Sequence, residues 1–211
     1  MITDRISSRT SRGVAGFTPK TICLSGSKNL HLNWVVSAKA LPKKVCDRFE
    51  ALGGSFSVEE PTVVGEDKLQ AHRVAEVHLI PWQPETMEMY QLLWDTALDA
   101  TTRHYGLKLS GISRMPHYVE YHSGNGHFHW HDDYSHESEE SPRKLTVVLQ
   151  LSDGAEYKGG DLEVFGATTT AVPRTRGTLI CLPSFVPHRV TPVVSGVRRV
   201  IVAWIAGPRL V

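Results

Sequence analysis

The chain has 211 residues, enough for one domain with a buried core. It carries 23 lysines and arginines against 22 aspartates and glutamates, so it offers no broad electrostatic footprint for nucleic acid or a membrane surface. Three widely separated cysteines, Cys23, Cys46 and Cys181, predict a reduced, cytoplasmic setting. No apolar run reaches the roughly 18 residues of a membrane span, and the first residues lack the apolar core of a signal peptide.

The first part of the chain is predicted to support the fold rather than to carry chemistry. Residues 1–28 are rich in Ser, Thr, Arg, Gly and Lys and are expected to form a flexible arm. The alternative is an expression remnant followed by a short edge strand at 21–24. We predict a single domain over 29–211, with a helical support region at 29–110 and a jelly-roll core at 111–211.

A first strand is expected at 30–36, followed by a helix that opens at Leu41-Pro42, where a proline fits because its missing N–H is not needed. Gly53-Gly54 is expected to end this helix in a left-handed C-cap. The polar residues 55–69 are then expected to form a loop or lid. The buried stripe of the helix is predicted from four apolar residues at near-helical spacing: Leu41, Val45, Phe49 and Leu52.

Residues 72–80 alternate like a strand, and Pro84 starts a second helix. The apolar residues of that helix recur at helical spacing and are predicted to pack against a sheet: Met89, Tyr90, Leu93, Trp94, Ala97, Leu98, Thr101 and Tyr105. After Ser110, short β-rich runs separated by Gly, Pro, Asn and Ser replace the helical pattern, as in an all-β sandwich or barrel. These runs are 117–122, 144–151, 161–165, 177–182 and 197–205.

A histidine-rich stretch lies at the centre of the sequence. Five of the eleven histidines fall between His122 and His136. Within this run His131 and Asp133 are two residues apart, a spacing that puts both side chains on one face of an extended strand. His188 follows far downstream. Two histidines and one carboxylate on one face of an iron leave further coordination positions open, the arrangement of non-heme Fe(II) oxygenases.

The region from about 118 to 208 resembles the prolyl-hydroxylase-like branch of the Fe(II)/2-oxoglutarate dioxygenases, especially the small stand-alone oxygenases of bacteria and their phages. The resemblance implies a double-stranded β-helix, a cupin-like jelly roll that is mainly β with buttressing N-terminal helices. The matching segments are collinear, and their order and spacing make the match specific. They are Tyr121-His-Ser-Gly124, His131-Asp-Asp133, Arg143 to Ser152, Tyr157-Lys-Gly-Gly-Asp-Leu162, Arg176 to Leu179, Pro183-Ser184, His188 to Val193, and Gly196-Val-Arg198 to Trp204.

The resemblance implies an enzyme that uses Fe(II), with 2-oxoglutarate and O2 as cosubstrates and ascorbate (vitamin C) as a candidate reductant. His131, Asp133 and His188 would hold the iron. Arg198 would grip the distal carboxylate of 2-oxoglutarate, because a guanidinium fork can make two parallel bonds to a carboxylate. Strand alternation puts Arg198 on one face with Trp204 and turns Arg199 outward; a register slip of one residue would exchange the two arginines.

Four further residues are expected in the cosubstrate pocket. In similar enzymes a tyrosine at the position of Tyr121 donates a hydrogen bond to the metal-bound carboxylate of the oxo acid. Gln150 stands where relatives carry a Tyr or Thr that assists the arginine, and its amide would donate an N–H to the carboxylate. Thr146 and Val148 share the face of Gln150 and are expected to line the pocket.

The substrate implied by the resemblance is a prolyl or other amino-acid side chain in a peptide or protein, hydroxylated at an unactivated C–H. A free amino acid or a natural product is the alternative. Arg73, His129 and Trp204 are assigned to the substrate mouth. No nucleic-acid substrate is expected, because relatives that act on nucleic acid carry a second arginine where this chain has Trp204.

Two hypotheses from other classes remain open. If the strand is regular, His127 and His129 share the face of His131, and a cupin-like metal protein that does not use 2-oxoglutarate could be built on His129 and His131. A catalytically silent jelly-roll binding module is the other. The residues from His136 to Glu140 are expected to form a solvated loop or a flap over the site.

Overall fold

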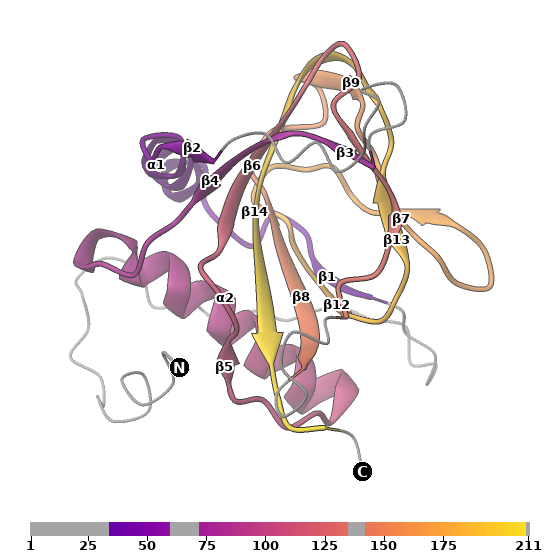
Figure 1. The fold of residues 1–211 in the computed structure, drawn as a ribbon. Helices are drawn as coiled ribbons and strands as arrows, with labels where there is room; N and C mark the ends of the chain where they lie inside the picture. Colours follow the sequence, from indigo (N-terminus) through magenta and orange to yellow (C-terminus); the bar gives the residue numbers. More distant parts are fainter. Residues whose placement is uncertain (1–33, 60–71, 135–141, 210–211) are drawn as a thin grey trace.

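The computed structural model describes residues 34–59, 72–134 and 142–209. The arm expected at 1–28 and the loop at 136–140 lie outside these residues, as does most of the strand expected at 30–36. The described residues form two antiparallel sheets that enclose an apolar interior, with two long helices against the outer face of the larger sheet (Figure 1). The predicted mainly β architecture with helical support is therefore confirmed.

The larger sheet has nine strands in the described residues, and β14 is its axis. This long strand pairs with both β6 and β8, so it joins two halves of the sheet. The path through the sheet is β1 (Val35–Ser37), β12 (Leu179–Pro183), β8 (Arg143–Gln150), β14 (Val193–Ala206), β6 (His117–His122), β4 (Glu76–Leu79) and β2 (Val58–Glu59), with β5 (Gly111–Ile112) and β9 (Tyr157–Gly159) also paired to β14.

The smaller sheet has five strands in the described part of the chain, and its centre carries the histidine-rich stretch. Its order is β11 (Thr170–Ala171), β10 (Leu162–Val164), β13 (His188–Val190), β7 (His127–His131) and β3 (Arg73–Val74). Figure 1 shows β7 and β13 on the side of the molecule opposite α1, so the interior of the barrel lies between these strands and the larger sheet. Valines and leucines from both sheets fill that interior.

The segment 72–80, expected to be one strand, is split between the two sheets. β3 pairs with β7 in the smaller sheet, whereas β4 pairs with β6 in the larger one. Alternation alone cannot show this, because it reports which side a residue faces and not which partner strand it meets. The split places Arg73 opposite Phe128 of β7.

The helices cover the apolar outer face of the larger sheet. The first, α1, spans Lys43–Gly53; the second begins with a 3-10 turn, η2 (Pro84–Thr86), continues as α2 (Met87–Ala100) and ends in a π-helical turn, η3 (Thr101–Tyr105). Phe49 of α1 and Leu93 of α2 are buried in the same cluster as Ile201 of β14. The predicted stripe of α2 is correct except at Leu98, which is 38% exposed; Leu92 and Thr96 are buried there instead.

The end of α1 differs from the prediction. Gly54 follows the helix with a φ of −72°, so the C-cap is right-handed and not left-handed. The glycine pair serves close packing instead: a Cβ added to Gly53 would lie 2.6 Å from the Tyr118 ring of β6. The helix can approach the sheet this closely only without a side chain at 53.

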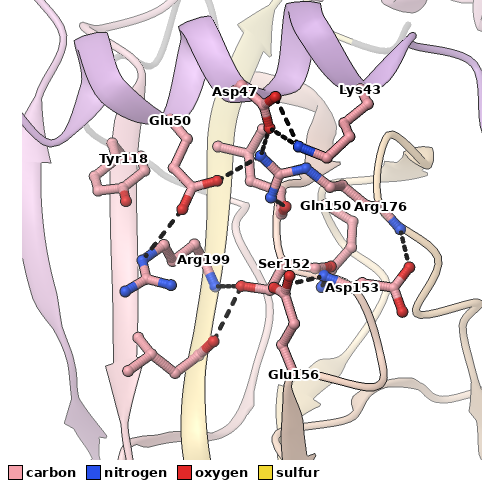
Figure 2. A network of polar contacts seen from close by, with 12 residues as sticks. Lys43, Asp47, Glu50, Tyr118, Gln150, Ser152, Asp153, Glu156, Arg176 and Arg199 are labelled. Carbon is pink, nitrogen blue, oxygen red and sulfur yellow. Dashed lines mark hydrogen bonds and ion pairs between the residues drawn. The ribbon is translucent and has the colours of Figure 1, made fainter.

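A polar network fastens α1 to the loops and strands beside it (Figure 2). Arg176 contacts Asp47 at 2.8 Å and Glu50 at 2.6 Å. Arg199, on the outer face of β14, contacts Glu120 of β6 at 2.6 Å and Glu50 at 3.6 Å. These cations are partly buried and paired, so they contribute to holding the helix in place rather than to a ligand site.

Neither helix in the described ranges is long and apolar enough to cross a membrane.

Candidate metal centre and cosubstrate pocket

Two histidines meet across neighbouring strands of the smaller sheet. His131 is the last residue of β7, and it pairs directly with His188, the first residue of β13. Their ring centroids are 4.3 Å apart. Residues directly opposite each other in an antiparallel pair lie close on one face of the sheet, so one strand pairing joins two histidines that are 57 positions apart in the sequence.

β7 contains a bulge that decides which histidines face inward. His188 pairs with His131, but Val190 pairs with Phe128, so β7 has one more residue than β13 over this stretch. As a result Phe128 shares a face with His131, and the two rings stack with centroids 3.5 Å apart. His127 and His129 pack on each other instead, at 4.5 Å. β7 is therefore not regular, so the condition under which His127 and His129 would share the face of His131 is not met.

Asp133 lies just beyond the end of β7 and is fixed by contacts on its backbone and side chain. Its N–H donates to the Ser184 carbonyl at 2.7 Å, and its Oδ2 accepts a hydrogen bond from Thr146 Oγ1 at 2.7 Å. The carboxylate lies between the two imidazoles, with Oδ1 3.8 Å from His131 Nε2 and Oδ2 3.4 Å from His188 Nε2. Strands β7, β8, β12 and β13 thus all contribute to its position.

The backbone also sets which ring nitrogen each histidine offers. His131 Nδ1 is 2.7 Å from the His129 carbonyl, and His188 Nδ1 is 3.0 Å from the Val186 carbonyl. A carbonyl only accepts, so each Nδ1 carries the proton and donates it. That leaves both Nε2 atoms, aimed at Asp133, as the nitrogens able to bind a metal.

The donor set fits a divalent metal. One ligand atom from each of His131, Asp133 and His188 lies within 4.8 Å of the others. Two neutral imidazole nitrogens and one carboxylate oxygen on one side of a cation suit Fe(II) and leave positions open on the other side. Each ligand also has a hydrogen bond on its outer side: Asp133 accepts one from Thr146, and the two histidines each donate one to a backbone carbonyl. Such outer contacts orient metal ligands.

The charges of the three groups depend on one another. Burial would raise the pKa of Asp133, but the His188 and His131 side chains and the Thr146 hydroxyl outweigh it and hold that pKa well below its usual value. Burial lowers the pKa of His131 to about 4, helped by the neighbouring His188. Burial also opposes the charge of His188, yet the hydrogen bond and charge of Asp133 raise its pKa. The carboxylate thus attracts positive charge at the place where a metal cation would supply it.

Arg198 is a buried cation on the inner face of β14. It is 2% exposed, and among the described residues it forms no ion pair with a carboxylate. It pairs across the sheet with Tyr121, and its Cζ lies 5.5 Å from the centroid of that ring. Alternation along β14 follows the predicted register: Val200 is in the interior cluster, and Ile201 packs toward the helices. A buried arginine without an acid is costly unless an anion binds beside it.

The residues predicted around Arg198 lie on the same inner face, with one change of role. Val148 and Thr146 are buried there with Tyr121. Gln150, however, uses its amide N–H groups on the Ser152 carbonyl at 3.0 Å and the Tyr157 hydroxyl at 3.1 Å. It does not present an N–H to the pocket as expected. It orients the Tyr157 phenol instead, whose own O–H stays available.

Tyr157 and Thr146 are functional candidates that the sequence reasoning missed or misjudged. Tyr157 sits in β9, opposite Gly196 and so two residues from Arg198 along β14. In the sequence Tyr157 stands only at the start of a Tyr-Lys-Gly-Gly turn, a pattern that does not indicate that it lies near Arg198. Thr146 was expected to line the pocket, but its hydroxyl binds Asp133 directly.

The mouth residues are divided. Trp204 lies on the inner face of β14, opposite Thr146, and Arg73 faces inward opposite Phe128, with its Cζ 5.2 Å from that ring. Both are therefore close to the metal cluster. His129 lies within the bulged segment and packs on His127.

Comparison with known proteins matches this geometry to a family. Residues 116–206 match the model of the 2OG-Fe(II) oxygenase superfamily, a range that contains all three candidate ligands and Arg198. A PKHD-type hydroxylase of Hyphomonas neptunium is 44% identical over 62 residues, which cover 29% of this chain and 28% of that protein. A PKHD-type hydroxylase of Synechococcus sp. is 39% identical over 85 residues, covering 39% of this chain and 36% of that protein. The chain therefore aligns with only about a third of the length of these relatives.

Solved structures show the same fold over most of the chain. A Pseudomonas putida prolyl-4-hydroxylase superposes with a TM-score of 0.61 at 22% identity, covering 85% of this chain and 94% of that one. A prolyl hydroxylase from Trichoplax adhaerens, solved with a hypoxia inducible factor peptide, gives a TM-score of 0.65 at 14% identity, with 82% and 83% covered. The predicted double-stranded β-helix is thereby confirmed. Residues 116–206 thus match the 2OG-Fe(II) oxygenase superfamily model, and the chain shares the fold of these prolyl hydroxylases.

Proposed function

We propose that this protein is an Fe(II)- and 2-oxoglutarate-dependent dioxygenase that hydroxylates an unactivated C–H of a prolyl or other amino-acid side chain in a peptide or protein. One observation carries the proposal: Arg198, buried without a carboxylate partner among the described residues, shares an inner surface with the cluster of His131, Asp133 and His188. A dicarboxylate cosubstrate that binds a metal through one end needs a cation nearby for its other carboxylate, and Arg198 is such a cation.

In this proposal His131 and His188 bind iron through Nε2 and Asp133 through its carboxylate, with Thr146 holding the carboxylate in place. When bound, the iron supplies O2 activation coupled to the oxidative decarboxylation of 2-oxoglutarate to succinate and CO2. Ascorbate would serve as the reductant. The protein supplies positioning and a surface from which water is excluded.

The pocket residues divide the binding of 2-oxoglutarate. Arg198 would bind its distal carboxylate through two parallel N–H donors, and the Tyr157 hydroxyl, oriented by Gln150, would donate a third. The Tyr121 hydroxyl makes no hydrogen bond within the described residues and would donate to the carboxylate nearer the metal. Val148, buried on the same face, would keep water away from the carbon chain that joins the two carboxylates of 2-oxoglutarate.

The relatives support an amino-acid side chain as the target. The P. putida protein is described as a prolyl-4-hydroxylase, and the T. adhaerens protein was solved with a peptide. A free amino acid or natural product is the alternative substrate. The cupin-like alternative loses support, because His129 does not join His131 at the metal cluster. Buried, free Cys46 and Cys181 agree with the reducing cytoplasm that we propose as the location.

The test is binding and turnover without substrate. Under anaerobic conditions Fe(II) and 2-oxoglutarate together should raise the melting temperature more than either alone, because both bind only the native state. Admission of air should then release succinate slowly through uncoupled turnover. No thermal shift and no succinate would reject the proposal in favour of a silent binding module.

A further inference from the structure

The inner face of the barrel ends in two buried polar side chains that lack partners. Trp204 is 8% exposed and His117 is 5% exposed, and their rings pack edge to face with centroids 4.7 Å apart. Trp204 Nε1 and both ring nitrogens of His117 have no hydrogen-bond partner in the described part of the chain. Buried donors in native proteins are nearly always paired, so each of these calls for a ligand or water.

Three arginines surround this pair of rings. The Cζ of Arg143 lies 4.8 Å from the Trp204 ring centroid, and that of Arg114 lies 5.7 Å from it. Arg73, whose Nε is buried without a hydrogen bond, reaches the same end of the barrel from β3. Arg73 and Arg114 form no ion pair with any carboxylate in the described ranges. Burial, followed by the charges of Arg114, Arg73 and Arg143, lowers the pKa of His117 to about 3, so all three cations lie within electrostatic reach of this ring.

This cationic group adjoins the metal cluster but is separate from the Arg198 pocket. Trp204 is the cross-strand neighbour of Thr146, which binds Asp133, and Arg73 packs on Phe128, which stacks on His131. Arg198 and Trp204 are six residues apart on β14, or roughly 20 Å along an extended strand. One 2-oxoglutarate bound at Arg198 therefore leaves the second cationic group for another anion.

We propose that this arginine mouth, made of Arg73, Arg114, His117 and Trp204, binds a carboxylate of the substrate, so that the enzyme acts on an acidic peptide segment. The inference rests on the proposed function and names its substrate class. Arginine forks and an indole N–H suit a carboxylate. The group extends from buried Trp204 to exposed Arg114, a reach that fits an extended chain with more than one acidic residue better than a compact molecule.

The experiment compares three capped proline peptides that differ only in their flanking residues: glutamate, glutamine or lysine. Binding is measured by calorimetry on the full chain loaded anaerobically with Fe(II) and 2-oxoglutarate. We expect the glutamate peptide to bind at least about tenfold more tightly than the glutamine peptide, since hydrogen bonds to charged groups are the strong ones. Its advantage should shrink as salt is raised, and the lysine peptide should bind weakest.

Variants locate the effect. Arg114→Gln and Arg73→Gln should each remove most of the glutamate advantage while leaving the thermal shift by Fe(II) and 2-oxoglutarate unchanged. Arg48→Gln is the control: Arg48 is an exposed arginine over an aromatic ring, 5.6 Å from Phe49, but it lies on α1 and is paired with Glu88. It should keep the full advantage.

Each other outcome has a defined meaning. Equal binding of the three peptides, or tighter binding of the lysine peptide, overturns the inference, and so does a single-stranded oligonucleotide that binds more tightly than the glutamate peptide. Binding of free proline but not of the capped peptides would show that the arginine mouth binds a carboxylate, and it would overturn the inference that the substrate is an acidic peptide. Loss of the thermal shift in the unmodified protein would instead reject the proposed function, so the two failures are distinguishable.

Discussion

On the helix-covered face of the nine-stranded sheet, the large cations have acids beside them: Arg176 contacts Asp47 and Glu50 (Figure 2), and Arg199 contacts Glu120. On the inner face of the same strands, Arg198 and the Trp204 indole have no such partner among the described residues. The two faces alternate residue by residue along β14. Paired polar groups hold this fold together, whereas unpaired ones mark where ligands are expected. Substitutions on the two faces should therefore separate stability from function.

The largest effect should come from the metal cluster. Asp133→Ala removes the only carboxylate between two imidazoles, so succinate formation should fall below detection and Fe(II) should no longer raise the melting temperature. The isolated protein should still fold, as judged by its circular dichroism. A variant that turns over 2-oxoglutarate would refute the assignment of this residue.

The helix-covered face of the sheet is tested by a substitution in the apolar core beneath α1. Phe49 is buried between α1 and the sheet, so Phe49→Ala should cost about 3 to 5 kcal/mol of unfolding free energy, measured by urea denaturation. Leu98→Ala, at an exposed position of α2, is the control and should change stability by no more than about 0.5 kcal/mol. Similar costs for both would show that α1 does not pack as described.

Adjacent arginines give the sharpest comparison of the two faces. Arg198→Ala should raise the KM for 2-oxoglutarate about 10- to 100-fold, the loss expected for hydrogen bonds to a charged group, with little change in stability. Arg199→Ala should leave that KM unchanged and cost about 1 kcal/mol of stability, because it breaks a partly exposed ion pair. Equal effects on KM would mean that the register of β14 does not set the roles.

A smaller effect is expected at Thr146. Thr146→Val keeps the shape of the side chain but removes the hydroxyl that donates to Asp133, and loss of such an orienting contact weakens metal affinity about 10- to 100-fold. Titration with Fe(II) under anaerobic conditions measures this. Thr96→Val is a matched control, since Thr96 is equally buried but its hydroxyl donates only to the Leu92 carbonyl within α2; it should bind iron normally.

Much of the fold could be predicted because local pattern and tertiary environment agree. The strand expected at 117–122 is β6 residue for residue, since its alternation matches a sheet buried on one face by helices and on the other by the barrel. The two helices follow for the same reason. The split of 72–80 and the close packing at Gly53 depend on partners that a local pattern does not contain.

The candidate site shows the same division. Side chains that follow strand alternation, such as Arg198 and Trp204, could be placed on the inner face from sequence. His127 and His129 could not, because a single unpaired residue in β7 reverses their orientation. Arg114 and His117 gave no motif at all, and only the fold brings them to Trp204.

The bulge in β7 makes the length of that strand as important as its composition. With one residue fewer between Phe128 and His131, the ladder with β13 would become regular. The imidazole at 131 would still share the inner face with Phe128, because residues two apart on a regular strand share a face, but the bulge in which its Nδ1 meets the His129 carbonyl would be lost. Among related sequences, a gap of one position in this segment would thus mark a change in how the imidazole is oriented rather than the loss of a ligand.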